Sequence, residues 1–176
     1  MKAENEIELL TKIQRLEISE KYWRKILESM SEMVTIHDKE FGLVYANPQA
    51  LKRFGKTLEE LRGRKCHEIY HNRREPLEFC PHLRAIKTGE PTIQEVVEPY
   101  LGGIFLISCS PIFDDEGNVT STVHMVRDIT EYKKVEEALK RSEKKYRDLV
   151  DNALVGVYST NLKGEVLYVN ESALRM

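Results

Sequence analysis

Two of the chain's three cysteines and three of its five histidines lie within one stretch, KCHEIYHNRREPLEFCPH, at residues 65–82. Cysteine and histidine side chains bind transition metals when three or four donor atoms converge at about 2.0–2.3 Å from one point. His67 and His71 are four residues apart and share one face of a helix, but the stretch contains no Cys-x-x-Cys pair. Two interpretations follow: a transition-metal site, or cysteines that pack as small apolar side chains in a core.

The composition of the chain excludes several classes of function. Its 176 residues are 41% hydrophobic and 32% charged, with a net charge of −2. This balance fits a folded domain with long solvated helices and predicts no basic surface for nucleic acid. No apolar run approaches the roughly 18 residues that span a bilayer, so we expect no direct membrane insertion of this segment. The odd number of cysteines, without a signal peptide, predicts a cytoplasmic location and no disulfide framework.

An internal repeat divides the chain. Residues 19–53 align without a gap onto residues 142–176 at a constant offset of 123, and nine of the 35 pairs are identical, Asn47 with Asn170 among them. We therefore expect one complete unit and the beginning of a second, as in a fragment of a longer multidomain protein.

Periodicity predicts the elements that must position these residues. Residues 1–31 carry apolar side chains at heptad spacing without Gly or Pro, which indicates a leader helix that pairs in a coiled coil. Asn47 followed by Pro48 predicts a helix start, and Thr57 with Glu60 has the spacing of a capping box. A third short helix is expected from the proline at 81, and a second heptad-patterned helix follows the last strand. The five expected strands lie at 33–38, 42–47, 92–98, 103–113 and 118–129.

The order of strand, strand, short helices and three strands, with YANPQALKRFG after the second strand, resembles the PAS family. The segment SPIFDDEGNVTSTVHMVRDITEYKKVEEALKRSEKKYRDLVDNA resembles that family's carboxy-terminal hairpin and the helical linker between tandem PAS domains. The resemblance implies an α+β PAS fold, an antiparallel five-stranded sheet with short helices on one face, flanked by long coiled-coil helices. It also implies four parts: a leader helix at 1–31, a complete PAS domain at 32–130, a helical linker at 131–152 and the start of a second, truncated PAS domain at 153–176.

One subgroup of PAS domains is similar within the stretch rich in cysteine and histidine. That subgroup has a Cys, a His and then a proline-flanked Cys-x-x-Cys-Pro. The chain matches it at Cys66, His71, Cys80 and Pro81, whereas Leu77 stands where the first paired cysteine belongs. The resemblance therefore implies Cys66, His71 and Cys80 as metal ligands, with one ligand fewer than in the subgroup.

Other PAS domains hold a haem or a small organic ligand in their core. His82, near the start of the helix before the three-strand half, is the candidate haem ligand. An organic ligand needs only an apolar cleft with a few polar groups. The candidate lining comes from one parity of a central strand and from residues expected opposite it, in and just before the third short helix: Phe79, Leu83, Ile86, Phe105, Ile107 and Cys109. Ordinary core packing is the alternative interpretation for all six.

The sequence contains no G-x-S-x-G, P-loop or H-E-x-x-H motif, so we expect a regulatory fragment rather than an enzyme. The heptad spacing of the apolar residues predicts a homodimer through the leader and linker helices. The resemblance to tandem PAS arrays implies a sensory module. It further implies a downstream output domain, a histidine kinase or a cyclic-dinucleotide enzyme. Asp128 and Thr130 of the RDITE segment are candidate signal-coupling residues, because both short side chains can cap the linker helix. The alternative function is a ligand-free PAS module that dimerises and acts as a spacer.

The beginning of the second unit, at 153–176, lacks the three strands that cover the first two strands in the complete unit. We therefore expect it to be disordered alone, or to pack onto another chain. The apolar residues left without a core are Leu154, Val155, Val157, Val166, Leu167 and Val169.

Overall fold

A computed structural model describes residues 2–175, with side chains from residue 10 onward. The chain divides into two compact units, residues 1–129 and 130–176. The first unit begins with helix α1 (Lys2–Ser29). This confirms the predicted leader helix, while its coiled-coil pairing stays a prediction; Leu9, which begins the heptad pattern, has its side chain outside the described part. None of the helices formed by residues 2–175 combines the length and apolarity needed to cross a membrane.

A five-stranded antiparallel sheet forms the centre of the first unit. Its strands are β1 (Met33–Asp38), β2 (Leu43–Ala46), β3 (Thr92–Glu98), β4 (Gly103–Phe113) and β5 (Val119–Asp128), in the spatial order β2-β1-β5-β4-β3. The first strand in the chain therefore pairs with the last one at the middle of the sheet. All five predicted strands are confirmed, each to within one residue at either end.

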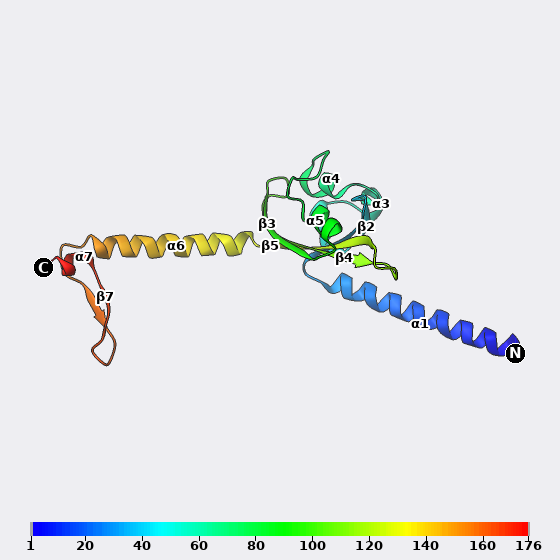
Figure 1. Ribbon diagram of the computed structural model, residues 1–176, viewed down its shortest axis with the longest axis horizontal. Helices are drawn as coiled ribbons and strands as arrows, with labels where there is room; N and C mark the ends of the chain where they lie inside the picture. Colours follow the sequence, from blue (N-terminus) through cyan, green and yellow to red (C-terminus); the bar gives the residue numbers. More distant parts are fainter. Residues whose placement is uncertain (1, 176) are drawn as a thin grey trace. The chain divides into compact units, whose positions relative to one another are not determined.

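Four short helices connect β2 to β3: α2 (Pro48–Phe54), α3 (Leu58–Leu61), α4 (Cys66–His71) and α5 (Pro81–Thr88). Figure 1 shows α3, α4 and α5 gathered over the sheet. Asn47 caps α2, because its Oδ1 accepts a hydrogen bond from the Ala50 amide at 3.0 Å. Thr57 and Glu60 form the reciprocal capping box at the start of α3. Both predicted helix starts are confirmed.

The core lies between the sheet and these short helices. Phe105, Ile107 and Cys109 occupy alternate positions of β4 and are all buried, as one face of a strand requires. Leu61 of α3 and Ala85 of α5 belong to the same buried cluster. The inner face of the sheet and the covering helices are therefore the elements that position any internal site.

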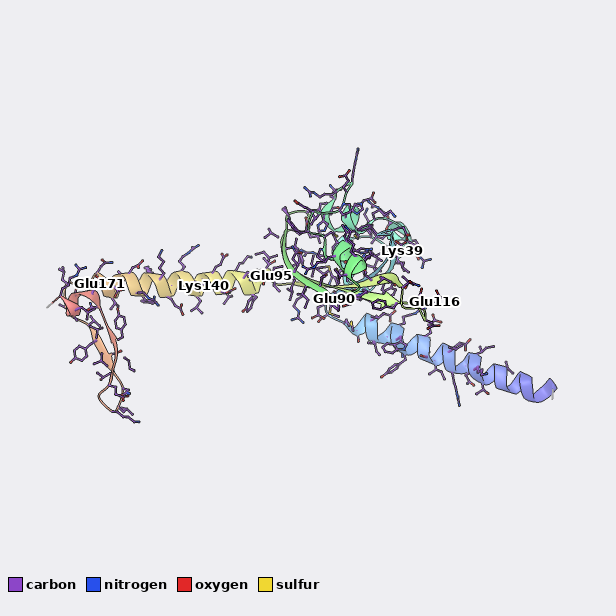
Figure 2. The ribbon with its side chains drawn as sticks, in the orientation of Figure 1. Lys39, Glu90, Glu95, Glu116, Lys140 and Glu171 are labelled. Atoms are coloured by element: carbon purple, nitrogen blue, oxygen red, sulfur yellow. The ribbon has the colours of Figure 1, made fainter. Side chains whose placement is uncertain are left out.

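The second unit consists of α6 (Thr130–Asp151), β6 (Tyr158–Thr160), β7 (Val166–Val169) and α7 (Glu171–Leu174). β6 and β7 form a two-stranded antiparallel sheet. Lys140, labelled on α6 in Figure 2, pairs with Glu136 at 2.7 Å on an exposed helix surface. The heptad-spaced apolar residues of α6 are all exposed: Tyr132, Val135, Leu139, Tyr146 and Leu149.

Candidate functional site

Three histidines from three different elements meet in the core of the first unit. His37 lies on β1, His124 on β5 and His82 on α5. Thr35 stands opposite His124, and His37 opposite Thr122, in the β1–β5 ladder. Residues that stand opposite each other point to the same face of a sheet, so this pairing places four polar side chains together on the inner face. With His82 from α5, five buried side chains form the candidate site, which we call the histidine cluster: Thr35, His37, His82, Thr122 and His124.

Hydrogen bonds fix the tautomer of His37. Burial lowers the pKa of its ring to about 3, so the ring is neutral near pH 7. Nδ1 lies 3.3 Å from the carbonyl oxygen of Phe41, which can only accept, so Nδ1 carries the proton. Nε2 then accepts from the Thr35 hydroxyl at 2.9 Å. The Thr35 oxygen in turn accepts from the Tyr70 hydroxyl at 2.8 Å, which completes a directed chain from Tyr70 to Phe41.

His82 and His124 form the second half of the cluster. His82 Nδ1 and His124 Nε2 are 2.7 Å apart, so one ring donates its proton to the other. The Thr122 hydroxyl lies 3.2 Å from the first nitrogen and 3.1 Å from the second. The His124 ring also lies 4.4 Å, centroid to centroid, from the His37 ring. Within the described chain, His82 Nε2 is a buried atom without a hydrogen-bond partner.

Burial also lowers the pKa values of the other two histidines. The pKa of His82 falls to about 4, because burial outweighs the opposing effects of the Asp38 carbonyl and carboxylate. The pKa of His124 lies well below its ordinary value, first because of burial and then because of the neighbouring His37 and His82. The cluster is therefore neutral at physiological pH, and placing a positive charge on it requires a strong compensating change.

Phe41 covers the cluster from the turn between β1 and β2. Its ring stacks on the His82 ring at a centroid distance of 4.6 Å and meets the His67 ring edge-on at 5.6 Å. The backbone of Phe41 has a φ of 73°, a left-handed conformation that is unusual for a bulky residue. Its carbonyl accepts from both the His37 ring and the Cys66 amide. The side-chain and backbone contacts of Phe41 together hold this turn over the histidines.

A small cavity of about 20 Å³ lies beside the cluster. Its lining, from α4, α5, β4 and β5, consists of Cys66, Tyr70, His71, Cys80, Pro81, His82, Ile107, Cys109, His124 and Val126. All three cysteines are free and buried, and burial raises the pKa values of the Cys66 and Cys109 thiols. Those two side chains are therefore protonated, weakly polar groups in the wall of a space of about the size of one water molecule.

The predicted metal ligands Cys66, His71 and Cys80 all lie in the wall of this cavity. His71 Nδ1 is already engaged by the buried carboxylate of Glu98, whose second oxygen accepts from the Tyr100 amide. Among the side chains that the structure describes, from residue 10 onward, no three from His, Cys, Asp or Glu are arranged so that they could hold a metal ion. The structure thus brings the three residues to one cavity but does not converge their donor atoms.

The six predicted pocket residues are divided between different surfaces. Ile107 and Cys109 line the small cavity, and Phe105 is buried beside Arg53. Phe79 is 73% exposed and, with Leu83, lines a separate surface hollow of about 280 Å³. Ile86 is half-buried and lines neither space.

The residues present do not fit a haem. The candidate ligand His82 is fully buried, its Nδ1 is bonded to His124, and the adjoining cavity of about 20 Å³ leaves no space for a porphyrin. His82 is instead part of a packed hydrogen-bonded network.

Sequence reasoning missed His37, His124 and the two threonines as site residues. The signal available was a repeated motif: T-x-H at 35–37 recurs at 122–124 and places a Thr and a His on the same face of each strand. Parity alone does not assign that face to the core, because most of the apolar residues of both strands, such as Val34, Ile36 and Val123, stand on the other face. That both pairs lie in the two strands at the middle of the sheet depends on the pairing of β1 with β5.

Asp128, a predicted coupling residue, is the last residue of β5, and Thr130 is the first residue of α6. The Asp128 carboxylate lies 3.7 Å from the guanidinium of Arg53, at the end of α2. Arg53 also donates to the Leu101 carbonyl and lies over the Phe105 ring at 5.4 Å. The end of the sheet is therefore connected to α2 immediately before the linker helix begins.

An antiparallel five-stranded sheet with short helices between its second and third strands defines a small α+β domain built around an internal site. The family model described as "PAS fold" matches residues 27–134, and a second one, "PAS domain", matches residues 144–176. The chain belongs to the PAS family. Its first unit is a PAS domain, and the second match begins within α6.

Individual relatives agree with this membership. The methanogenesis regulatory histidine kinase FilI of Methanothrix harundinacea is 28% identical over 132 residues, which is 73% of this chain. The chain spans only 15% of the length of that relative. Among solved structures, the PAS domain of Bordetella pertussis BvgS superposes with a TM-score of 0.51 at 18% identity, covering 73% of this chain and 98% of that domain. An RNA-binding light-oxygen-voltage receptor superposes with a TM-score of 0.53 at 20% identity, covering 70% of this chain and 37% of the receptor. These two likenesses concern the fold.

Proposed function

We propose that the chain is a regulatory PAS module of a multidomain signalling protein that passes the state of its first domain through α6 to a downstream output domain. The observation that carries this proposal is α6: a helix of 22 residues, none of them buried, with heptad-spaced apolar residues along its length. Such a seam is suited to pair with a second copy of itself. The similarity to a histidine kinase supports an output domain of that type.

We place the module itself outside catalysis. Burial raises the pKa values of the Cys66 and Cys109 thiols and keeps these two candidate nucleophiles protonated. In the proposed homodimer, the exposed apolar residues of α1 and α6 pair with those of a second copy. Three free cysteines support a reducing cytoplasm as the location.

The histidine cluster and its cavity are the proposed input site. A cavity of about 20 Å³ takes one water-sized molecule or one ion, not an organic cofactor, unless the core opens. A single transition-metal ion is one candidate occupant, since Cys66, Cys80 and Cys109 line the wall with His82 and His124. It would require side-chain rotation, because their donor atoms do not converge.

The second candidate function is the ligand-free dimerisation module. The same small cavity favours it, because a filled core is what a domain without a ligand requires. Native mass spectrometry and metal analysis of the purified chain separate the two. A stoichiometric metal or small molecule supports an input site, and a clean apo mass in every preparation supports the spacer.

The relay itself is tested by insertions near Lys140 in the parent protein. One inserted residue rotates the downstream part of the seam by about 100°, whereas seven restore its register approximately. Insertions of one to four residues should therefore scramble or invert regulation, and seven should preserve it. An output that is the same for every insertion length would mean that α6 is a passive tether.

A further inference from the structure

One buried asparagine connects the leader helix to the first PAS domain. Asn47 is completely buried. Its Oδ1 accepts from the amides of Val34 and Ala50, both at 3.0 Å. Its Nδ2 donates to the carbonyls of Leu27 at 3.2 Å and Glu32 at 2.9 Å. The side-chain amide thereby uses both donors and both acceptor positions, and we call this arrangement the asparagine clamp.

The second unit contains the same clamp. Asn170 is also completely buried. It accepts from the amides of Val157 at 2.9 Å and Ala173 at 3.0 Å, and donates to the carbonyls of Val150 at 2.8 Å and Val155 at 3.0 Å. Each partner lies 123 residues after its counterpart in the first unit. The clamp is therefore a property of the unit rather than an accident of one turn.

Capping alone does not require an asparagine. Ser or Asp caps a helix about as well as Asn, because only an acceptor oxygen is needed. In each unit, the two N–H donors of the asparagine side chain bond instead to backbone carbonyls that precede the first strand. Leu27 lies in the last turn of α1, and Val150 in the last turn of α6, where carbonyls have no partner within the helix. In both units the clamp thus attaches the end of the incoming long helix to the first strand and first short helix of the domain.

In the first domain, α2 continues this connection to the outgoing helix. Asn47 caps the start of α2, and Arg53 lies in its last turn. Seven residues of helix span about 10 Å. Arg53 pairs with Asp128 at 3.7 Å, two residues before α6 begins at Thr130. A single helical segment therefore links the last turn of the leader helix to Asp128, two residues before the linker helix begins.

We propose that α2 is a mechanical connector between the two flanking helices, with Asn47 as its entry and Arg53 as its exit. Movement of the last turn of α1 reaches Asp128 through α2 without passing through the histidine cluster. The domain then relays a signal from a preceding segment as well as from its own core. This inference rests on the proposed relay function, and it names the path of the relay, from α1 through α2 to Asp128.

Amide hydrogen exchange measured by NMR on the whole chain tests the connector in both directions. The Met30 amide, bonded to the Leu27 carbonyl, reports on the end of α1. The Ile129 amide, bonded to the Ile104 carbonyl, reports on the exit. The Gly89 amide, at the end of α5, is the internal control.

Asn47→Ser keeps the cap on Ala50 and removes both donations to the leader segment. We expect exchange at Met30 and at Ile129 to rise about three- to tenfold, as for the loss of one or two hydrogen bonds, with Gly89 unchanged. Coupling is reciprocal. Arg53→Met, which keeps an apolar side chain over Phe105 but removes the charge, should therefore raise exchange at Met30 about twofold.

Asn170→Ser is the matched control, because it removes the same donations in the second unit. It should raise exchange at Ala153, whose amide bonds the Val150 carbonyl, and leave Met30 and Ile129 unchanged. The connector is refuted if the folded Asn47→Ser variant leaves amide exchange at Ile129 unchanged, or if exchange rises equally at Met30, Ile129 and Gly89. Should Asn47→Ser not fold, Arg53→Met decides alone: an unchanged Met30 overturns the proposal. These readouts need neither stimulus nor output, so they are independent of the insertion test.

Discussion

The beginnings of the two PAS units have the same backbone hydrogen bonds but very different surroundings. In the first unit Leu43 is 1% exposed, whereas its counterpart Val166 in the second unit is 59% exposed. The strand, turn, strand and cap form in both, because each depends on contacts within about twenty-five residues. Burial depends on three further strands, which the described residues of the second unit do not include. Local geometry and stability are thus encoded at different distances along the chain.

The turn between the first two strands shows a second difference. Phe41, with a φ of 73°, corresponds to Gly164, with a φ of 84°. Glycine adopts this left-handed conformation without a steric penalty, and phenylalanine does not. The second unit also has Thr160 at the position of His37. The first unit therefore has a strained aromatic residue that stacks on the histidine cluster. The second unit has a glycine at this position and no histidine equivalent to His37.

The largest expected effect is acid destabilisation of the first unit. Unfolded histidines titrate near pH 6.5, whereas the folded pKa values of His37 and His82 are about 3 and about 4. The unfolded state therefore binds more protons below pH 6.5, and stability falls as the pH drops from 7 toward 4. These two residues should cost on the order of 4 kcal/mol between pH 7 and pH 5.

Urea unfolding at the two pH values measures this loss. His37→Thr, which copies the residue of the second unit, should remove about half of it, on the order of 2 kcal/mol. A stability that does not change between pH 7 and 5 would show that the histidines are protonated in the folded state.

A matched pair of truncations tests the difference in burial. Leu43→Ala should lower the free energy of unfolding by about 3 kcal/mol, because it opens a cavity in the core. Val166→Ala at the equivalent position should change it by less than about 0.5 kcal/mol. Chemical denaturation of both variants gives the comparison. Equal effects would mean that a partner covers the second unit in solution.

Substitution of the turn residue Phe41 by glycine has a smaller expected effect. Phe41→Gly loses the stacking on His82 and His67 but relieves the left-handed strain, for a net loss of about 1–2 kcal/mol. Thermal unfolding measures the loss, and the His82 ring resonances should shift. A variant more stable than the parent would show that strain outweighs stacking at this position.

Gly164→Ala should have the smallest effect. A Cβ at Gly164 meets no atom within 4 Å, so the cost is the left-handed backbone alone, about 1 kcal/mol. Amide exchange along β6 and β7 should rise about fivefold, with the first unit unaffected. Unchanged exchange would indicate that the hairpin is already open most of the time.

The sequence predicted those parts of the fold that depend on neighbouring residues. Asn47 before Pro48 and the pair Thr57–Glu60 specify helix starts by their own hydrogen bonds, so their positions were correct. The histidine cluster was not predicted as a unit, because it joins residues 37, 82 and 124 through the pairing of β1 with β5 and the packing of α5. The three cysteines and His71 were found by residue type, but only the packing shows that they surround one cavity.

Phe79 illustrates the opposite error. Its hydrophobicity and its place just before α5 suggested a pocket wall, yet the segment between α4 and α5 turns its side chain outward. Irregular segments have no periodicity from which an inward face can be derived. The second unit shows regular elements where disorder was one expectation, and whether they persist without a cover stays a prediction.

The equivalence of the two asparagine clamps bears on how arrays of such units gain or lose copies. Joining Ala46 directly to Asn170 removes 123 residues, and Asn170 then meets the Leu27 and Glu32 carbonyls that Asn47 meets now. A genetic crossover at this position therefore deletes one whole copy without leaving a buried polar group unpaired at the new junction. The reverse event adds a copy in the same register. Copy number in the gene can change while every helix-to-domain junction keeps its geometry.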